Sequence, residues 1–398
     1  MVTFDYHARI ARYQESLAKL GAACGLVLKP ANVRYLCGFW GYATRAEYSE
    51  PRRLICLVVP ARGRPLLAVP KIEFVFARRA TAALGLEVRR HVEWKEEGET
   101  EDSWGIVRSF LRENGVSGGR VSVEREYLAH RAWTALDAAF AGFELTNTSG
   151  LIEQMRMIKD AAEIQLMRRC GEVAVGQLET EIAAIARGGY REYEIALIGW
   201  EYVVRRCAEV MEGNEVNSPI GEGVQLVTSG PRLAMSHGSA SARRIAPDDV
   251  VMMDFCRVPY LLGYRIGMGR VVTQRRLTSE EEDIDATIQQ AYRVGLSLVR
   301  PGVTCTEIDA TIRSVLVKGG LAEFVVHRNG RGLGIESVEL PEIKEGIETP
   351  LQAGMVVSIE PSIYRDGFAA RVEDTMVVTN DGPDILTPAP VDIRRLIR

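Results

Sequence analysis

The spacing of apolar residues changes near Ser149 and Gly150, and this change limits the folds that the chain can adopt. Before it, residues 6–20 carry apolar positions at helical spacing, and short apolar runs typical of strands follow. The predicted strands cover residues 25–28, 53–59, 65–70 and 120–124. Because strands that alternate with helical stretches are typical of α/β domains, we expect such a domain in the first part of the chain.

After Gly150 the pattern predicts longer helices and a different kind of sheet. The helices are expected at residues 151–183, from about 192, at 279–299 and at 305–318. The β-rich runs between them cover residues 224–228, 250–255, 269–273, 354–359 and 371–378. They predict a helix-flanked, largely antiparallel sheet. We therefore predict two domains, residues 1–155 and 156–398, a division that suits a chain of 398 residues.

The charge and cysteine content narrow the class of protein. The formal net charge is −4 at pH 7, which argues against nucleic acid or a membrane surface as a partner. The seven cysteines are scattered singly without a CxxC pair, as expected for reduced thiols. The N-terminus has no apolar signal core, and no run of about 18 apolar residues predicts a membrane span. We predict a cytoplasmic protein.

Six segments, in one order along the chain, resemble the family of creatinase, prolidase and aminopeptidase P. They are residues 32–39, 155–164, 229–238, 248–255, 355–364 and 371–375. The first is similar to the N-terminal domain of that family and the others to its catalytic domain. The resemblance covers nearly the whole chain. It implies an α/β N-terminal domain followed by an α+β catalytic domain of the pita-bread fold, with a curved, largely antiparallel sheet flanked by helices.

The metalloenzymes of that family hold two divalent cations with five ligands, in the order Asp, Asp, His, Glu and Glu. Three positions match here, namely Asp254, Glu360 and Glu373. The histidine position holds Arg331, which opens the glycine-containing frame of residues 331–336. A guanidinium is permanently charged and only donates hydrogen bonds, so it cannot ligate a cation.

The second aspartate of the family is also missing. Its position aligns with Gly267, or with Arg265 if the usual spacing is kept strictly, and neither side chain supplies an oxygen ligand. Two unit charges about 4 Å apart repel or attract by roughly 4 kcal/mol at an effective dielectric of 20. Arg331 is therefore expected to exclude a metal and to pair with Glu360 or Glu373. We predict a site with no metal and no other cofactor.

His237 and Glu360 are the predicted catalytic residues. Of the five histidines, only His237 falls on a segment that matches an active-site segment of the family. Histidine titrates near neutral pH and can accept and donate a proton in one cycle. The resemblance implies that Glu360 contacts the substrate. A structural role is the alternative for each, since His237 could help a loop to close and Glu360 could simply pair with Arg331.

Six further residues are predicted to bind the substrate. The resemblance to creatinase-like dimers implies that residues 39–45 of one subunit close the pocket of the other, so we predict a homodimer with the N-terminal domain near the partner's pocket. Charged residues of the catalytic domain would hold a small-molecule substrate, although a buried carboxylate must in any case be paired. The predicted residues are Arg331, Glu373, Asp254, Arg265, Tyr42 and Arg45.

These predictions favour a metal-independent hydrolase of a non-peptide C–N bond in a small zwitterionic metabolite. The chain departs from creatinase itself, because Gly269 and Glu373 replace a glutamate and a histidine of that enzyme. Two alternatives remain open. One is an Xaa-Pro peptidase or dipeptidase-like metallohydrolase with a degenerate metal site. The other is a lyase, or a non-catalytic small-molecule-binding protein, on the same fold.

Overall fold

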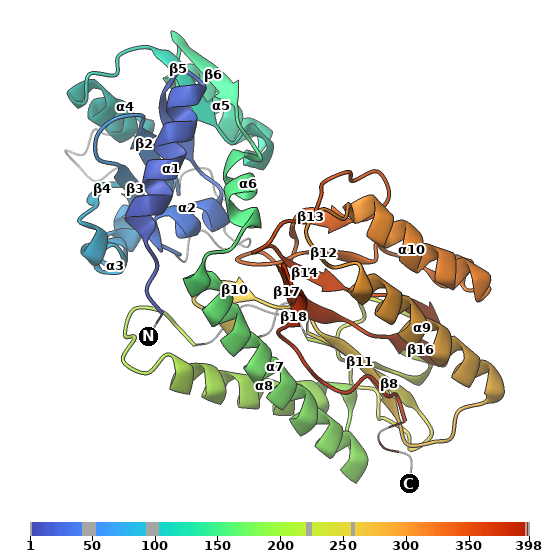
Figure 1. Ribbon diagram of the computed structural model, residues 1–398. Coiled ribbons are helices and arrows are strands. Elements are labelled where there is room, and N and C mark those ends of the chain that lie inside the picture. Colours follow the sequence, from blue (N-terminus) through green and yellow to red (C-terminus); the bar gives the residue numbers. More distant parts are fainter. Residues whose placement is uncertain are drawn as a thin grey trace. The chain divides into compact units, whose positions relative to one another are not determined.

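The computed structural model describes residues 2–41, 53–92, 103–219, 225–255, 259–394 and 396. The chain divides into two compact units, Phe4–Arg156 and Met157–Arg398. Figure 1 shows both units, each with its own sheet or sheets and its own helices. Within the described residues, no helix combines the length and the apolar character that a membrane span requires.

The N-terminal unit is an α/β domain, as predicted. Its mixed sheet has the strand order β4-β3-β2-β1-β5-β6. The β1–β5, β5–β6 and β3–β4 pairs are parallel, and β1–β2 and β2–β3 are antiparallel. The strands are β1 (Ala22–Val27), β2 (Cys56–Pro60), β3 (Leu66–Pro70), β4 (Glu87–His91), β5 (Gly119–Val123) and β6 (Phe143–Asn147). The helices are α1 (Tyr6–Lys19), α2 (Pro30–Cys37), α3 (Phe74–Ala80), α4 (Ser103–Glu113), α5 (His130–Ala139) and α6 (Leu151–Met157).

The single helical run predicted for residues 151–183 is wrong, because the structure has two helices there. Helix α6 ends at Met157, and α7 (Ala161–Arg187) begins after three intervening residues. Asp160 starts α7 by accepting a hydrogen bond from the Glu163 N–H, and the Glu163 carboxylate accepts one from the Asp160 N–H. This reciprocal capping box fixes the helix start and interrupts the helical spacing.

The C-terminal unit is an α+β domain in which every strand pair is antiparallel. One sheet has the order β11-β8-β7 and a second the order β13-β12-β14-β17-β18. The strands are β7 (Leu226–Ser229), β8 (Val250–Asp254), β11 (Gly269–Thr273), β12 (Gly330–Gly332), β13 (Glu339–Ile343), β14 (Val356–Ile359), β17 (Asp374–Thr379) and β18 (Gly382–Ile385). Two hairpins are formed by β9 (Tyr260–Leu261) with β10 (Tyr264–Arg265) and by β15 (Ser362–Arg365) with β16 (Phe368–Arg371). A backbone bridge between Gly269 and Glu373 joins the two sheets.

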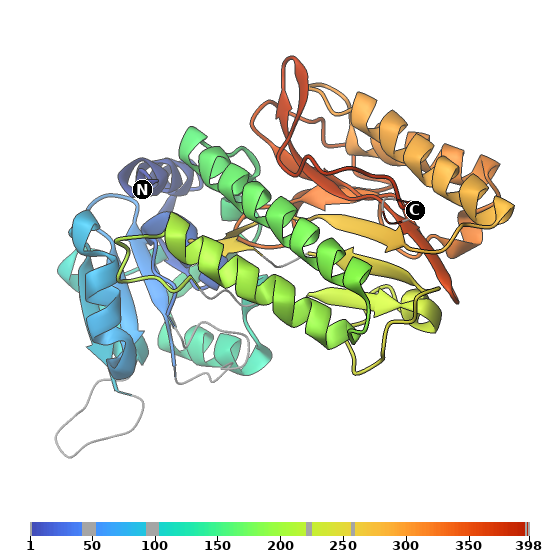
Figure 2. The same ribbon diagram turned by 90° about the horizontal axis from the view of Figure 1, so that it is seen from below.

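Helices cover both faces of these sheets, as Figure 2 shows. Helices α7 and α8 (Glu192–Val210) run side by side on one face. Helices α9 (Ser279–Ser297) and α10 (Cys305–Lys318) pack on the other. The buried side chains between α9, α10 and the strands form one apolar core, which includes Ile288, Ile312 and Val357. This core holds the strand ends that carry the charged residues of the site.

Candidate functional site

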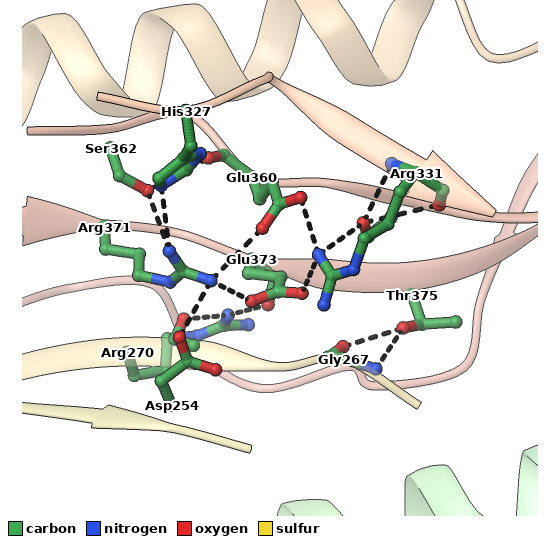
Figure 3. A network of polar contacts seen from close by, with 12 residues as sticks. Asp254, Gly267, Arg270, His327, Arg331, Glu360, Ser362, Arg371, Glu373 and Thr375 are labelled. Atoms are coloured by element: carbon green, nitrogen blue, oxygen red, sulfur yellow. Dashed lines mark hydrogen bonds and ion pairs between the residues drawn. The ribbon is translucent and has the colours of Figure 1, made fainter. Parts of the chain in front are cut away.

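Five charged residues from separate strands meet inside the C-terminal unit. Asp254 ends β8, Arg331 lies in β12, Glu360 follows β14, Arg371 ends β16 and Glu373 precedes β17. None of them is more than 6% exposed. Figure 3 shows their charged groups pointing toward one another between the strands. We call these five residues the guanidinium–carboxylate cluster.

The two guanidiniums of the cluster each bridge several carboxylates. Arg331 Nη1 lies 2.6 Å from Glu360 Oε1 and 3.0 Å from Glu373 Oε1. Arg371 Nη2 lies 3.0 Å from Asp254 Oδ2 and 3.2 Å from Glu360 Oε2, and it also pairs with Glu373 Oε2. With all groups ionised, three carboxylates face two guanidiniums. The cluster therefore carries one uncompensated negative charge.

Further hydrogen bonds hold Arg331 in this position. Its Nε donates to the carbonyl oxygen of Ser337 at 2.9 Å, and its Nη1 donates to Ser358 Oγ at 3.3 Å. Among the described residues, no hydrogen bond is formed by Arg331 Nη2, and no dashed line reaches it in Figure 3. Arg331 thus has one donor group left for a ligand.

The structure decides between the two alternatives for the missing aspartate. A Cβ atom on Gly267 would lie 2.2 Å from Glu373 Oε1 and 3.0 Å from Arg331 Nη2, so Gly267 stands directly beside the cluster. Hydrogen bonds with Thr375 hold it there, since the Gly267 N–H donates to Thr375 Oγ1 at 2.9 Å and that hydroxyl donates to the Gly267 carbonyl at 2.7 Å. Any side chain here would displace Glu373.

Arg265, the other alternative, lies over an aromatic ring instead. Its guanidinium is 5.1 Å from the centre of the Tyr260 ring, and its backbone N–H donates to the Gly334 carbonyl at 2.9 Å. Its predicted role in substrate binding stays a prediction.

The pKa values of two cluster carboxylates, Asp254 and Glu373, are shifted in opposite directions. Burial raises the pKa of Asp254 to about 7, and the charge of Glu373 adds to this rise while Arg371 opposes it. Burial alone would also raise the pKa of Glu373, but Arg331 and Arg371 lower it to about 2. At neutral pH Glu373 is therefore a permanent carboxylate, whereas Asp254 is poised to gain or lose a proton.

Asp254 also has an oxygen without a partner. Its Oδ2 pairs with Arg371, but its buried Oδ1 has no hydrogen bond among residues 2–41, 53–92, 103–219, 225–255, 259–394 and 396. A buried acceptor without a donor costs about 1–3 kcal/mol, and more when the group is charged. A ligand that donates a hydrogen bond to this oxygen would remove that cost, so Asp254 Oδ1 is a favourable binding point for a donor group.

His327, which was not among the predicted site residues, contacts the cluster. Its Nε2 lies 2.8 Å from Tyr364 Oη and 3.2 Å from Arg371 Nη1, and Arg371 Nη1 also donates to Tyr364 Oη. Burial and the charge of Arg371 lower the pKa of His327, so its ring is neutral at neutral pH. The signal for this residue was its position, only four residues before Arg331.

The structure does not bring His237 into the cluster. It lies in the turn after the short helix η5 (Gly230–Ala234), and its side chain is exposed. In the described part of the chain no hydrogen bond or ion pair joins it to a cluster residue. Helix η5 packs against β15 and β16, so the His237 loop still borders the hairpin that carries Arg371. Tyr42 and Arg45 lie outside the described residues.

Two divalent cations do not fit among these side chains. The carboxylate oxygens that would bind them already face Arg331 Nη1 and Arg371 Nη2 at 2.6–3.2 Å. A cation about 4 Å from a guanidinium would be repelled by roughly 4 kcal/mol at an effective dielectric of 20 for each unit of charge. Among the described residues, no group of three or more His, Cys, Asp or Glu side chains is arranged to hold a metal ion. The positive charge at this site comes from arginine.

Comparison with known proteins identifies both units. Residues 165–380 match the model of metallopeptidase family M24, and residues 9–158 match the creatinase/prolidase N-terminal domain. The chain is 30% identical to the probable dipeptidase PepE of Mycobacterium tuberculosis, over 98% of this chain and 96% of that protein. It is 28% identical to the putative dipeptidase YkvY of Bacillus subtilis, over 97% and 99%.

Solved structures give the same result. Dipeptidase PepE from Mycobacterium ulcerans superposes with a TM-score of 0.79 at 29% identity, with 98% of each chain covered. The prolidase from Thermococcus sibiricus superposes with a TM-score of 0.83 at 26% identity, with 99% of each chain covered. The predicted fold class and family are confirmed.

The comparisons contradict the predicted hydrolysis of a non-peptide C–N bond. Relatives that match nearly the whole chain include proteins named probable dipeptidase, putative dipeptidase and Xaa-Pro dipeptidase. That prediction rested on the two metal-ligand positions that hold Arg331 and Gly267, which do not define the bond that is cleaved.

Proposed function

Since the chain belongs to metallopeptidase family M24, we propose that it binds a dipeptide at the guanidinium–carboxylate cluster. Full-length similarity to proteins named dipeptidases supports this ligand class. The observation that carries the proposal is the charge of the cluster, which has one carboxylate more than guanidiniums and an unpartnered oxygen on Asp254. A dipeptide is a zwitterion, so each of its ends finds an opposite charge here.

The amino terminus of the dipeptide is assigned to Asp254. An ammonium group supplies three N–H donors, and Asp254 Oδ1 is the buried acceptor that lacks one. Ammonium binding also places a positive charge beside Asp254, which a buried carboxylate requires. A carbonyl or carboxylate oxygen of the dipeptide is assigned to Arg331 Nη2, a donor for which no hydrogen bond is found among the described residues.

A comparison of free and blocked dipeptides tests this proposal. In isothermal titration calorimetry at pH 7.5, the wild type should bind dipeptides with a free amino terminus. N-acetylation should weaken binding by about tenfold or more, because it removes the charge and a hydrogen bond to a charged group is worth about 1.5–3 kcal/mol. Equal affinity for free and acetylated ligands, or no binding to any dipeptide, would refute it.

A matched pair of variants sharpens the test. Asp254→Asn keeps the shape of the side chain and removes its charge, so it should lower dipeptide affinity by a similar factor. Asp283→Asn removes a carboxylate from the exposed face of α9 and should leave the affinity unchanged. If the two variants behaved alike, Asp254 would not be the group that binds the amino terminus.

Hydrolysis of the bound dipeptide is the second candidate function. Asp254 is the observation that favours it, since a carboxyl with a pKa of about 7 can accept a proton from water near neutral pH. Arg331 would then stabilise the developing negative charge on the peptide oxygen. Release of free amino acids by the wild type, and its loss in Asp254→Asn even at dipeptide concentrations that saturate the variant, would support this function. If the protein bound the dipeptide but released no amino acids, in buffers with and without added Mn²⁺, its function would be binding without hydrolysis.

A further inference from the structure

The loop that carries His237 is attached at both ends to one buried carboxylate. Glu192, the first residue of α8, is fully buried. Its Oε1 accepts hydrogen bonds from the backbone N–H and the hydroxyl of Ser229, both at 2.8 Å. Its Oε2 accepts from the N–H of Ser241 at 3.0 Å, from the Ser241 hydroxyl at 2.6 Å and from Arg232. One side chain therefore fixes the loop at residues 229, 232 and 241.

Other contacts depend on the same arrangement. Arg232, placed by Glu192, donates through Nη2 to the carbonyl of Ser239 at 2.8 Å, two residues after His237. The backbone N–H of Tyr193 donates to the Ser241 carbonyl at 3.0 Å, so the start of α8 also holds the loop through its main chain. The loop is anchored just before and just after the turn of His237, while His237 itself is exposed.

The chemistry of this anchor requires a carboxylate. Five donors converge on two oxygens, and one of the donors, Arg232, is a cation. An ionised carboxylate offers about four lone-pair sites and no donor, whereas an amide would present an N–H₂ group to some of these donors. The first turn of α8 adds favourable interaction with negative charge.

We infer that Glu192 is a positioning residue for the ligand site, which holds the 230–241 loop in the conformation that presents His237 to the dipeptide. We call the five hydrogen bonds that Glu192 accepts from the loop the clamp. The inference rests on the proposed function for the identity of the ligand, but the clamp can be measured in the ligand-free protein. Helix η5 at the start of the loop packs on β15 and β16, the hairpin that ends at Arg371, so a displaced loop would move His237 relative to the cluster.

Hydrogen exchange of the ligand-free protein tests the clamp. Glu192→Gln should raise amide exchange within residues 232–240 by about tenfold or more, since each lost hydrogen bond to a charged group corresponds to at least that factor. Exchange in α9 and α10 should stay as in the wild type. Ser241→Ala removes one of the five hydrogen bonds and should perturb folding less than Glu192→Gln. It should therefore give a smaller increase in amide exchange. Glu201→Gln, at an exposed ion pair on the same helix, is the control. Unchanged exchange in both Glu192→Gln and Ser241→Ala would overturn the clamp.

A double-mutant cycle tests whether the clamp acts through His237. Glu192→Gln should lower dipeptide affinity by about tenfold in the wild-type background but by less than about twofold in the His237→Ala background. An equal loss in both backgrounds would show a purely structural role and overturn the positioning inference. If the wild type bound no dipeptide, the proposed function would be wrong. The exchange measurement would still show whether Glu192 holds the loop in place.

Discussion

Removal of the Arg331 guanidinium should destabilise the C-terminal unit by several kcal/mol. In Arg331→Met, Glu360 Oε1 and Glu373 Oε1 lose the cation that lies 2.6 Å and 3.0 Å from them. Removing one partner of a buried ion pair typically costs about 3–5 kcal/mol, because the charge left behind cannot be solvated. Arg371 remains as the only guanidinium of the cluster and cannot compensate three carboxylates. We therefore expect a loss of about 3–5 kcal/mol in the free energy of unfolding at pH 7.5.

The pH dependence of this loss follows from Glu373. Its folded pKa of about 2 lies below its unfolded value, so it contributes stability above about pH 4.5 that disappears as the pH falls toward 2. Without Arg331 this contribution is largely lost. The difference in the free energy of unfolding between wild type and Arg331→Met should thus be greatest above pH 5. It should become smaller as the carboxylates are protonated at lower pH.

Urea unfolding at pH 7.5 and at pH 4, or scanning calorimetry, measures both effects. Arg205→Met is the matched control, since its ion pair with Glu201 is exposed and worth less than about 1 kcal/mol. A loss below about 1 kcal/mol in Arg331→Met at pH 7.5, equal to that of the control, would refute the reasoning that this guanidinium holds the cluster together.

Three further predictions concern metal binding, burial and the His327 contact. Arg331→His alone should not create tight metal binding, because Gly267 still supplies no ligand; stoichiometric Mn²⁺ in elemental analysis of that variant would contradict this. Burial raises the pKa of Glu181 to about 8, so this group lowers stability progressively as the pH rises from about 4.5 to 8, by up to about 5 kcal/mol. Glu181→Gln should therefore be more stable than wild type at pH 8 but not at pH 4.5 in urea unfolding, and a gain of equal size at both pH values would contradict it. His327→Ala should weaken dipeptide binding by about tenfold through Arg371, whereas His130→Ala on α5 should not; equal affinities in calorimetry would rule this out.

The fold was predictable from sequence because its signals are local and repeated. The helix at residues 305–318 and the strand at 269–273 have the bounds that spacing predicted, since glycine, proline or a capping threonine marks their ends. The break at Asp160 was missed, because the apolar spacing continues across it and only the capping box stops the helix. Periodicity describes which face is buried but not where hydrogen bonds are interrupted.

The membership of the cluster was predictable only in part. Asp254, Glu360, Glu373 and Arg331 lie on segments that resemble the family, and the structure brings these four together. The choice among nearby arginines was not predictable, because neighbouring residues of a strand point to opposite faces. Arg270 turns away and pairs with Asp374, whereas the residue beside it, Gly269, leaves room for Arg371.

The central claim is that arginine supplies the positive charge that divalent cations would otherwise bring to this site. Calorimetric titration of chelator-treated wild type with Mn²⁺, Co²⁺ and Zn²⁺, together with elemental analysis of protein prepared without chelator, tests it most directly. We expect no stoichiometric metal and no saturable heat at the cluster. About two metal ions per chain, lost in a variant in which Glu360 and Glu373 are both replaced by Gln, would contradict it.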